Sequence, residues 1–120
     1  MATIELTTEN FQEIIAENAT VIVDFWADWC GPCRSFAPTF EAASEKYPGA
    51  VFGKVDTEAQ QAIASAFSIR SIPTLMIFRD QIIIYSEAGA LSAGAFAQLI
   101  DQAIALDMDT VRAEIADQAN

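Results

Sequence analysis

The chain has 120 residues, 52% of them apolar, and its 17 acidic and 6 basic side chains give a formal net charge of −11. This length closes one hydrophobic core and is too short for two ordinary ones, so we expect one globular domain without long disordered segments. The acidic balance repels phosphate backbones and anionic membrane surfaces, which argues against nucleic acid or a membrane as a partner and leaves two uses for the charge, solubility or the steering of a basic partner.

Hydrophobic periodicity predicts strands and helices that alternate along the chain. Apolar side chains at helical spacing indicate helices, and apolar β-branched and aromatic runs indicate strands covered on both faces. In chain order we expect a helix over 9–18, a strand over 21–27, a helix over 33–47, a strand over 50–56, a helix over 58–68, strands over 74–79 and 82–87, and a helix over 91–106 capped near Ser92. This order predicts an α/β fold in which a central mixed sheet of four or five strands is flanked by helices on both faces.

Two places in these elements depart from regular structure. Pro38 lies inside the helix expected over 33–47, where it removes a backbone donor, so we expect a kink and a break between two helical segments. The turn of the expected hairpin contains Asp80 and Gln81, where Asn-Gly is usual. A positive φ at Gln81 costs about 1 kcal/mol unless the turn is of another type.

The last residues, 107–120, form an additional segment. Val111 and Ile115 are four apart, which predicts a short amphipathic helix. This helix either packs on the body or docks a partner. We therefore divide the chain into a domain over 1–106 and a C-terminal helical extension of the same domain over 107–120.

The two cysteines, Cys30 and Cys33, lie three residues apart where a strand passes into a helix, so they share one helix face and can form a disulfide. Such a bridge closes almost no loop and stabilises by about 2 kcal/mol at best, so its function is chemical. The helix N-terminus favours an anion, hence a thiolate at the first cysteine. We expect Cys30 to attack from an exposed junction and Cys33, one turn into the helix, to resolve. Gly31 leaves room for a partner backbone, and Pro32 suits the first helical turn.

Other uses of the cysteine pair fit the sequence less well. A structural zinc site needs about four ligands, whereas the chain has two cysteines and no histidine. Haem attachment requires a histidine directly after Cys33, where Arg34 stands. A buried, inert pair is a further alternative, but the tight spacing at a helix start favours a reactive one.

Asp24 interrupts a strand that is otherwise apolar. Burial of its carboxylate raises its pKa, so a sequence selected for stability alone would place an apolar residue there. We expect Asp24 to act as a general acid and base that takes the proton from Cys33, directly or through a water. The alternative is that the strand twists Asp24 to the surface.

Four segments, "VDFWADWCGPC", "KVD", "SIRSIPTLMIF" and "GALS", resemble the thioredoxin family in order and spacing, and the resemblance covers residues 4 to 105. It implies the thioredoxin fold, with Cys30 as nucleophile, Cys33 as resolving thiol and Asp24 as the buried carboxylate. It also implies that Lys54 tunes Asp24 electrostatically and that Pro73 is a cis-proline facing the dithiol. The surface that docks client proteins is implied at Trp29, Gly31, Pro32, Ile72, Pro73, Gly89 and Ala90.

This implied docking surface has two departures from the family pattern. Ile72 is expected to offer backbone hydrogen bonds to an extended client segment. Ser71 stands where the family commonly has glycine, and Thr57 stands where an apolar residue near the dithiol is common. Both substitutions add polarity to the surface and so bear on client preference.

The resemblance implies a dithiol–disulfide oxidoreductase that reduces client proteins through a mixed disulfide and is recycled by a thioredoxin reductase. NADPH and flavin then belong to the reductase, and we expect no cofactor on this chain, which acts as a monomer. The first residues show neither a basic nor an apolar signal region, so a cytoplasmic location is expected. Two alternatives are a thioredoxin-like adaptor with a non-essential dithiol, and a disulfide-forming oxidant; Gly31-Pro32 resembles the reducing members.

Overall fold

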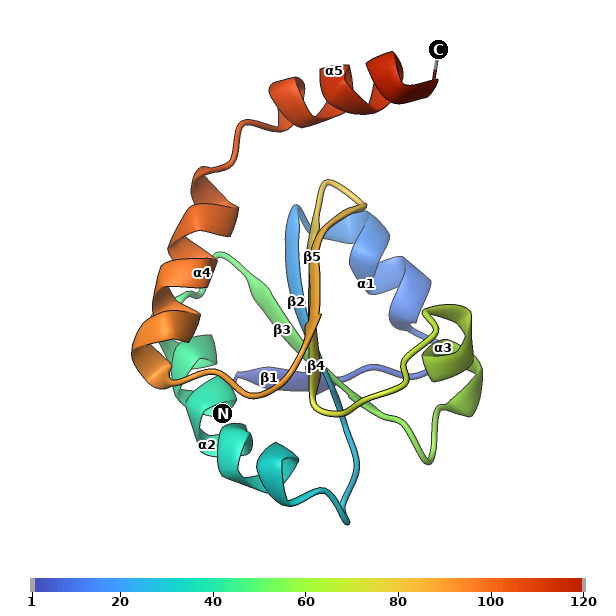
Figure 1. The fold of residues 1–120 in the computed structure, drawn as a ribbon, viewed down its shortest axis with the longest axis vertical. Coiled ribbons are helices and arrows are strands. Elements are labelled where there is room, and N and C mark those ends of the chain that lie inside the picture. The colour runs from blue at the N-terminus through green and yellow to red at the C-terminus, as the bar shows by residue number, and fades with distance from the viewer. Residues whose placement is uncertain (1, 120) are drawn as a thin grey trace.

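The computed structural model describes residues 2–119, so Met1 and Asn120 lie outside the described part. A five-stranded sheet is flanked by helices on both faces, as Figure 1 shows. The strands are β1 (Thr3–Glu5), β2 (Thr20–Trp26), β3 (Val51–Asp56), β4 (Thr74–Arg79) and β5 (Ile82–Ala88), and the helices are α1 (Phe11–Glu17), α2 (Gly31–Lys46), α3 (Gln61–Ala66), α4 (Ala93–Ala105) and α5 (Met108–Ala119). The predicted fold class is confirmed, whereas the division of the chain at residue 106 stays a prediction.

The sheet is mixed, with strand order β1-β3-β2-β4-β5. β2 pairs in parallel with β3 and antiparallel with β4, and β4 pairs antiparallel with β5. The central position of β2 explains its composition, because a strand with neighbours on both edges and helices on both faces contacts almost no water.

The edge strand β1 was not among the elements predicted from the sequence. Its three residues have no buried side chain, so they carry no hydrophobic signal. It pairs in parallel with β3, and Leu6 directly after it is fully buried. The Leu6 side chain occupies the space that a Cβ on Gly53 would fill, so glycine in β3 permits this close approach.

Successive side chains of β2 point to opposite faces of the sheet, where two separate clusters form. Val21, Val23 and Phe25 join the cluster under α1 and α3. Ile22 joins the cluster under α2 and α4. By this alternation Asp24 lies on the α2 side of the sheet.

The structure shows how the chain accommodates the two irregular positions, Pro38 in α2 and the turn between β4 and β5. α2 runs through Pro38 as one helix, so the expected break into two segments is wrong. A buried face that includes Phe36 and Phe40 packs α2 onto the sheet on both sides of the proline, which outweighs one missing backbone donor. Asp80 and Gln81 have φ of 50° and 70°, the conformation of a type I′ hairpin turn.

α4 begins at a capping contact, and α5 packs on the body only near its start. The predicted cap of α4 is confirmed, since the Ser92 side chain accepts a hydrogen bond from the Ala95 amide at 3.2 Å.

In α5 only Met108 is buried and Val111 half-buried, so this helix packs on the body through its first turn alone. Among residues 2–119 no helix has the length and apolar content needed to cross a bilayer.

Candidate active site

The two cysteines form a disulfide at the start of α2, with their Cα atoms 5.2 Å apart. Cys30 is the N-cap residue and Cys33 lies in the first turn. The expected exposure of Cys30 is wrong for this oxidised form: Cys30 is 4% exposed and Cys33 is 3% exposed. The reason is the neighbouring loop, because the Cys30 Sγ lies 3.7 Å from the Ile72 carbonyl oxygen.

Hydrogen bonding at the helix start acts on Cys30. The Cys33 amide donates to the Cys30 Sγ at 3.2 Å, so the sulfur takes the place that a capping oxygen usually has. In the reduced protein the same amide and the positive end of α2 stabilise negative charge on this sulfur. Cys33 has no equivalent position, because its side chain follows the helix start. The two cysteines are therefore electrostatically unequal.

Asp24 is fully buried, which excludes the alternative that the strand turns it to the surface. Both of its carboxylate oxygens lack a hydrogen-bond partner among the described residues. Burial raises the pKa of Asp24 from 3.8 to about 6, and the positive charge of Lys54 opposes part of that rise. A carboxyl group with this pKa exchanges protons readily near neutral pH.

Lys54 lies beside Asp24 in the sheet. The two residues are in register across the β2–β3 pair, and Lys54 shares the α2 side of the sheet because Phe52, two residues before it, packs in that cluster. The Lys54 Nζ stands 5.0 Å from the centroid of the Trp26 ring, a cation–π contact. This contact holds the lysine charge at the same end of the sheet as Asp24.

The loop before β4 faces the disulfide. The Ile72–Pro73 peptide bond is cis, and the Gly89 amide donates to the Pro73 carbonyl at 2.8 Å. Gly89 has φ of 110°, a conformation that favours glycine. Ala90 follows it and is exposed. The Gly89–Pro73 hydrogen bond joins the two loops, and the Ile72 carbonyl places the first of them beside the Cys30 Sγ at the start of α2.

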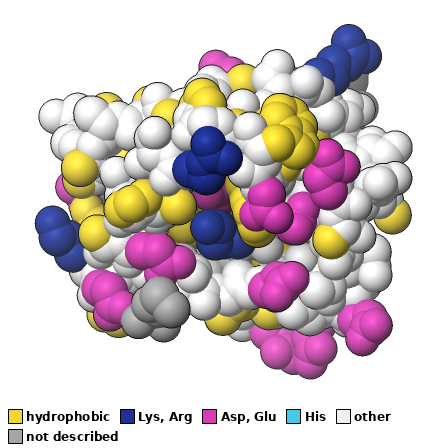
Figure 2. All heavy atoms as spheres, turned by 90° about the horizontal axis from the view of Figure 1, so that it is seen from below, with side chains coloured by type: hydrophobic (Ala, Val, Ile, Leu, Met, Phe, Trp, Pro, Cys, Tyr) yellow, Lys and Arg dark blue, Asp and Glu magenta, His cyan; other side chains and the backbone are white. Residues whose placement is uncertain are grey.

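The surface around the disulfide is largely open to solvent. Trp29 is 67% exposed, Gly31 and Pro32 are exposed, Ile72 is half-buried and Pro73 is buried. Figure 2 views the molecule from the end where β2 passes into α2, and it shows hydrophobic side chains near basic ones at the centre, with acidic ones around them on both sides. Such a surface suits an extended polypeptide rather than an enclosed small molecule.

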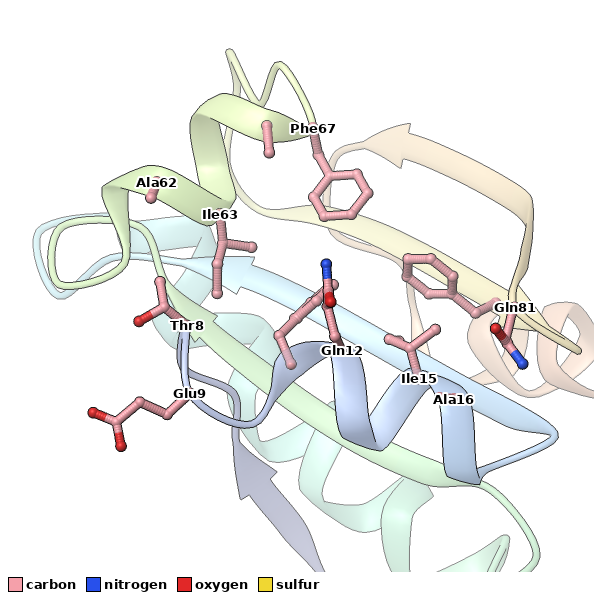
Figure 3. A pocket seen from close by; sticks show the side chains of 12 residues that line it. Thr8, Glu9, Gln12, Ile15, Ala16, Ala62, Ile63, Phe67 and Gln81 are labelled. Atoms are coloured by element: carbon pink, nitrogen blue, oxygen red, sulfur yellow. The ribbon is translucent and has the colours of Figure 1, made fainter.

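A groove of about 650 Å³ lies elsewhere, between α1 and α3, as Figure 3 shows. Its floor includes Phe11, Ile15 and Phe78 from the cluster under α1 and α3. Asp24 and α2 are on the opposite side of the sheet, so this groove takes no part in the chemistry of the cysteines.

Comparison with known proteins agrees with this geometry. The thioredoxin family model matches residues 2–102. The chain belongs to the thioredoxin family. It is 53% identical over 117 residues to a Streptomyces coelicolor protein named as a thioredoxin, covering 98% of this chain and 87% of that one. It is 39% identical over 103 residues to a Buchnera aphidicola thioredoxin, covering 84% and 95%.

Solved structures of the family have the same fold. Plasmodium falciparum thioredoxin aligns with a TM-score of 0.77 at 36% identity, covering 83% of this chain and 97% of that one. A mutant thioredoxin from Halobacterium salinarum aligns with a TM-score of 0.79 at 31% identity, covering 88% and 92%. With the family shown and its Cys-x-x-Cys pair joined as a disulfide, the chain is a thiol–disulfide oxidoreductase. The adaptor alternative is not favoured.

Sequence reasoning missed Glu58. Its Oε1 accepts a hydrogen bond from the Trp29 indole at 2.7 Å, while its amide donates to Asp56 Oδ1 at 3.0 Å. The available signal was topological, because parallel β2 and β3 end at the same edge of the sheet and bring the residues that follow them together. Thr57 was expected to add polarity to the docking surface. Its hydroxyl instead donates a hydrogen bond to the Trp26 carbonyl at 3.0 Å, so the hydrogen-bonding capacity of this donor is used within the protein.

Proposed function

We propose that this thioredoxin-family chain reduces disulfides of client proteins, with Cys30 as nucleophile, Cys33 as resolving thiol and Asp24 as proton acceptor. The observation that carries the proposal is the disulfide at the start of α2, next to the Ile72 carbonyl and on the same side of the sheet as the buried Asp24. Chemical inequality of the two cysteines is what an ordered, two-step exchange requires.

The first step forms a mixed disulfide. The Cys30 thiolate, stabilised by the Cys33 amide, attacks one client sulfur. A Cys30–client bond forms, the client disulfide breaks, and the second client sulfur leaves as a thiolate that takes up a proton. In this exchange the Cys30 sulfur and the two client sulfurs lie in one line. The client segment must therefore lie extended over the open surface around the disulfide.

The second step releases the client. Cys33 loses its proton to Asp24 and attacks the Cys30 Sγ, so that the Cys30–Cys33 bond forms and the Cys30–client bond breaks. The departing client sulfur takes a proton. The client gains two electrons and two protons, and the chain is left in the oxidised state that the structure contains.

Lys54 tunes the second step through Asp24. The charge of Lys54 lowers the pKa of Asp24, whereas burial raises it, so the balance places the carboxyl pKa at about 6. An acceptor with a pKa near 6 is mostly ionised at pH 7 and still returns its proton easily. Lys54 therefore acts through Asp24 rather than on the sulfurs.

Client docking is assigned to the surface around the disulfide. An extended client segment would add to the backbone at Ile72 and Pro73, as in strand addition. Trp29, Gly31, Pro32, Gly89 and Ala90 would form the rest of this surface. Glu58, bonded to the Trp29 indole, joins them as the residue that holds Trp29 in place.

Recycling and context complete the proposal. A thioredoxin reductase, with its own NADPH and flavin, would return two electrons to Cys30–Cys33, which places the chain in electron transport and cell redox homeostasis. A cytoplasmic monomer would serve this role. Size-exclusion chromatography with light scattering tests the monomeric state. We expect a molar mass near 13 kDa, and a doubled mass would contradict a monomer.

The deciding experiment is insulin reduction with NADPH and a thioredoxin reductase, run beside a glutathione-linked assay. We expect steady NADPH consumption in the reductase-coupled assay. Absence of turnover in both assays would contradict a disulfide reductase.

Matched variants separate the roles of the two cysteines. Cys33→Ser should accumulate a stable mixed disulfide with a client, because attack proceeds and resolution is lost. Cys30→Ser makes the same chemical change and should form none. Trapping by Cys30→Ser instead would reverse the assignment of nucleophile and resolving thiol.

A further inference from the structure

The last helix is joined to the body at its base by contacts of two arginines. The Arg79 side chain donates hydrogen bonds from Nη1 to the carbonyls of Ala103, Ile104 and Leu106, at the end of α4 and in the joint to α5. Arg112, one turn into α5, forms an ion pair with Asp80 at 3.1 Å in the β4–β5 turn. These contacts fix the direction in which α5 leaves the molecule.

Beyond its base, α5 carries an apolar stripe whose far end is left exposed by the described residues 2–119. Met108, Val111, Ile115 and Ala119 recur at spacings of three and four, which places them on one helix face. Met108 is buried and Val111 is half-buried, whereas Ile115 is 46% exposed and Ala119 is exposed. At 1.5 Å per residue the stripe from Val111 to Ala119 is about 12 Å long, the length of about two turns of a second helix.

The charges around this stripe are acidic. Asp107, Asp109, Glu114 and Asp117 are exposed on the segment. Arg112 is its one basic residue, and its charge is already paired with Asp80 and Asp109. A second copy of this chain also carries −11, so copies repel each other. The complementary occupant is a basic one.

The position of α5 separates it from the redox chemistry. The family model ends at residue 102, before α5, whereas the relative that covers 98% of the chain extends into it. In Figure 1, α5 lies at the opposite end of the molecule from the start of α2. A partner bound to α5 therefore leaves the cysteines open to clients.

We propose that α5 is a docking helix that binds a basic amphipathic helix of a partner protein through Val111, Ile115 and Ala119. Apolar contacts along the stripe provide the affinity, and the acidic flanks select lysine- or arginine-fringed partners and speed their association. Binding brings a partner to the dithiol protein without occupying the dithiol.

The test uses an 18-residue peptide of leucine and lysine with leucine at helical spacing, and its leucine–glutamate counterpart. Each is titrated into the ¹⁵N-labelled full chain at low and high salt. We expect the lysine peptide alone to bind, weaker at high salt, with amide shift changes centred on residues 109–119. Shift changes centred on the α1–α3 groove or around Cys30 would overturn the proposal.

Variants distinguish stripe docking from general attraction to an acidic protein. Ile115→Asp and Ala113→Asp make the same charge on opposite faces of α5, so electrostatics alone predicts equal or tighter binding for both. Stripe docking predicts binding about tenfold weaker for Ile115→Asp, a loss of about 1.4 kcal/mol, and undiminished binding for Ala113→Asp. Equal affinity of the two variants would contradict the proposal.

Two further variants control for loss of helix structure and for dependence on the dithiol. Ile115→Ala retains helix propensity and adds no charge, so weaker binding by this variant reports lost apolar contact rather than a frayed helix. Wild-type affinity of Ile115→Ala would count against the stripe. Cys30→Ser should bind the peptide as wild type does, because docking is independent of the proposed reductase function; lost binding would contradict that independence.

Discussion

The two faces of β2 differ in what burial does for the protein. Towards α1 and α3 the strand presents Val21, Val23 and Phe25, all fully buried in an apolar cluster. Towards α2 it presents Asp24, equally buried and without a hydrogen-bond partner for either oxygen among the described residues. Exclusion of water stabilises the first face, whereas it disfavours the charged form on the second. One strand therefore provides part of the core on one face and the proposed proton acceptor on the other.

The largest expected effect is on the apolar face. Phe25→Ala should lower the free energy of unfolding by about 3–5 kcal/mol, because it leaves a cavity beside Phe67, whose ring centroid is 6.2 Å from that of Phe25. Denaturant unfolding at pH 7 measures the loss. Phe25→Leu, which retains most of the volume, should lose much less. Equal losses for the two variants would show that the site is not closely packed.

The opposite face should respond in the opposite direction. The folded-state pKa of Asp24, about 6, is above its ordinary value of 3.8, so the folded protein binds the proton more tightly and its relative stability is lost as pH rises from about 4 through about 6. Asp24→Ala should therefore raise the free energy of unfolding at pH 8 by up to about 3 kcal/mol, from 1.36 kcal/mol per pH unit across that interval.

The pH dependence is the control for this gain. At pH 3 Asp24 is protonated in both states, so the stabilisation by Asp24→Ala should vanish. Asp117→Ala, at an exposed position on α5, should leave stability nearly unchanged at both pH values. Denaturant melts in which Asp24→Ala destabilises the protein at pH 8 would contradict the assigned cost of the buried charge.

A smaller effect is expected from Lys54. Lys54→Met removes the positive charge that lowers the pKa of Asp24, so the carboxyl should titrate above about 6. Carboxyl ¹³C shifts followed across pH measure this. Lys46→Met removes the same charge from the last turn of α2 and should leave the titration in place. An unchanged midpoint in Lys54→Met would separate Lys54 from Asp24.

Much of the fold was predictable from local patterns, and the errors have physical causes. The apolar run around Asp24 and the Cys30–Cys33 spacing depend on neighbours in the sequence. β1 was missed because its pairing with β3 is long-range and its side chains are not buried. The break at Pro38 was wrong because packing on the sheet outweighs one lost hydrogen bond.

The site shows the same limit. The burial of Cys30 depends on the loop at Ile72, forty-two residues away, and no local pattern reveals it. Glu58 reaches Trp29 because two strands end at one edge of the sheet. The exposed length of α5 also depends on what the body leaves uncovered. Local sequence therefore indicates the candidate residues of the site, and tertiary contacts decide how these residues are held.

The most direct test of the central claim is the pH profile of client release in single-turnover reduction of a disulfide peptide. Wild type and Asp24→Asn are compared by stopped flow. Cys33→Ser reports the attack step alone, so the comparison isolates client release, the step that Asp24 is proposed to assist. We predict that release in wild type accelerates as pH rises through about 6, and that Asp24→Asn slows release about 10²-fold at pH 7 and removes that inflection while attack is unchanged. Equal release rates for the two proteins from pH 5 to 8 would contradict the account.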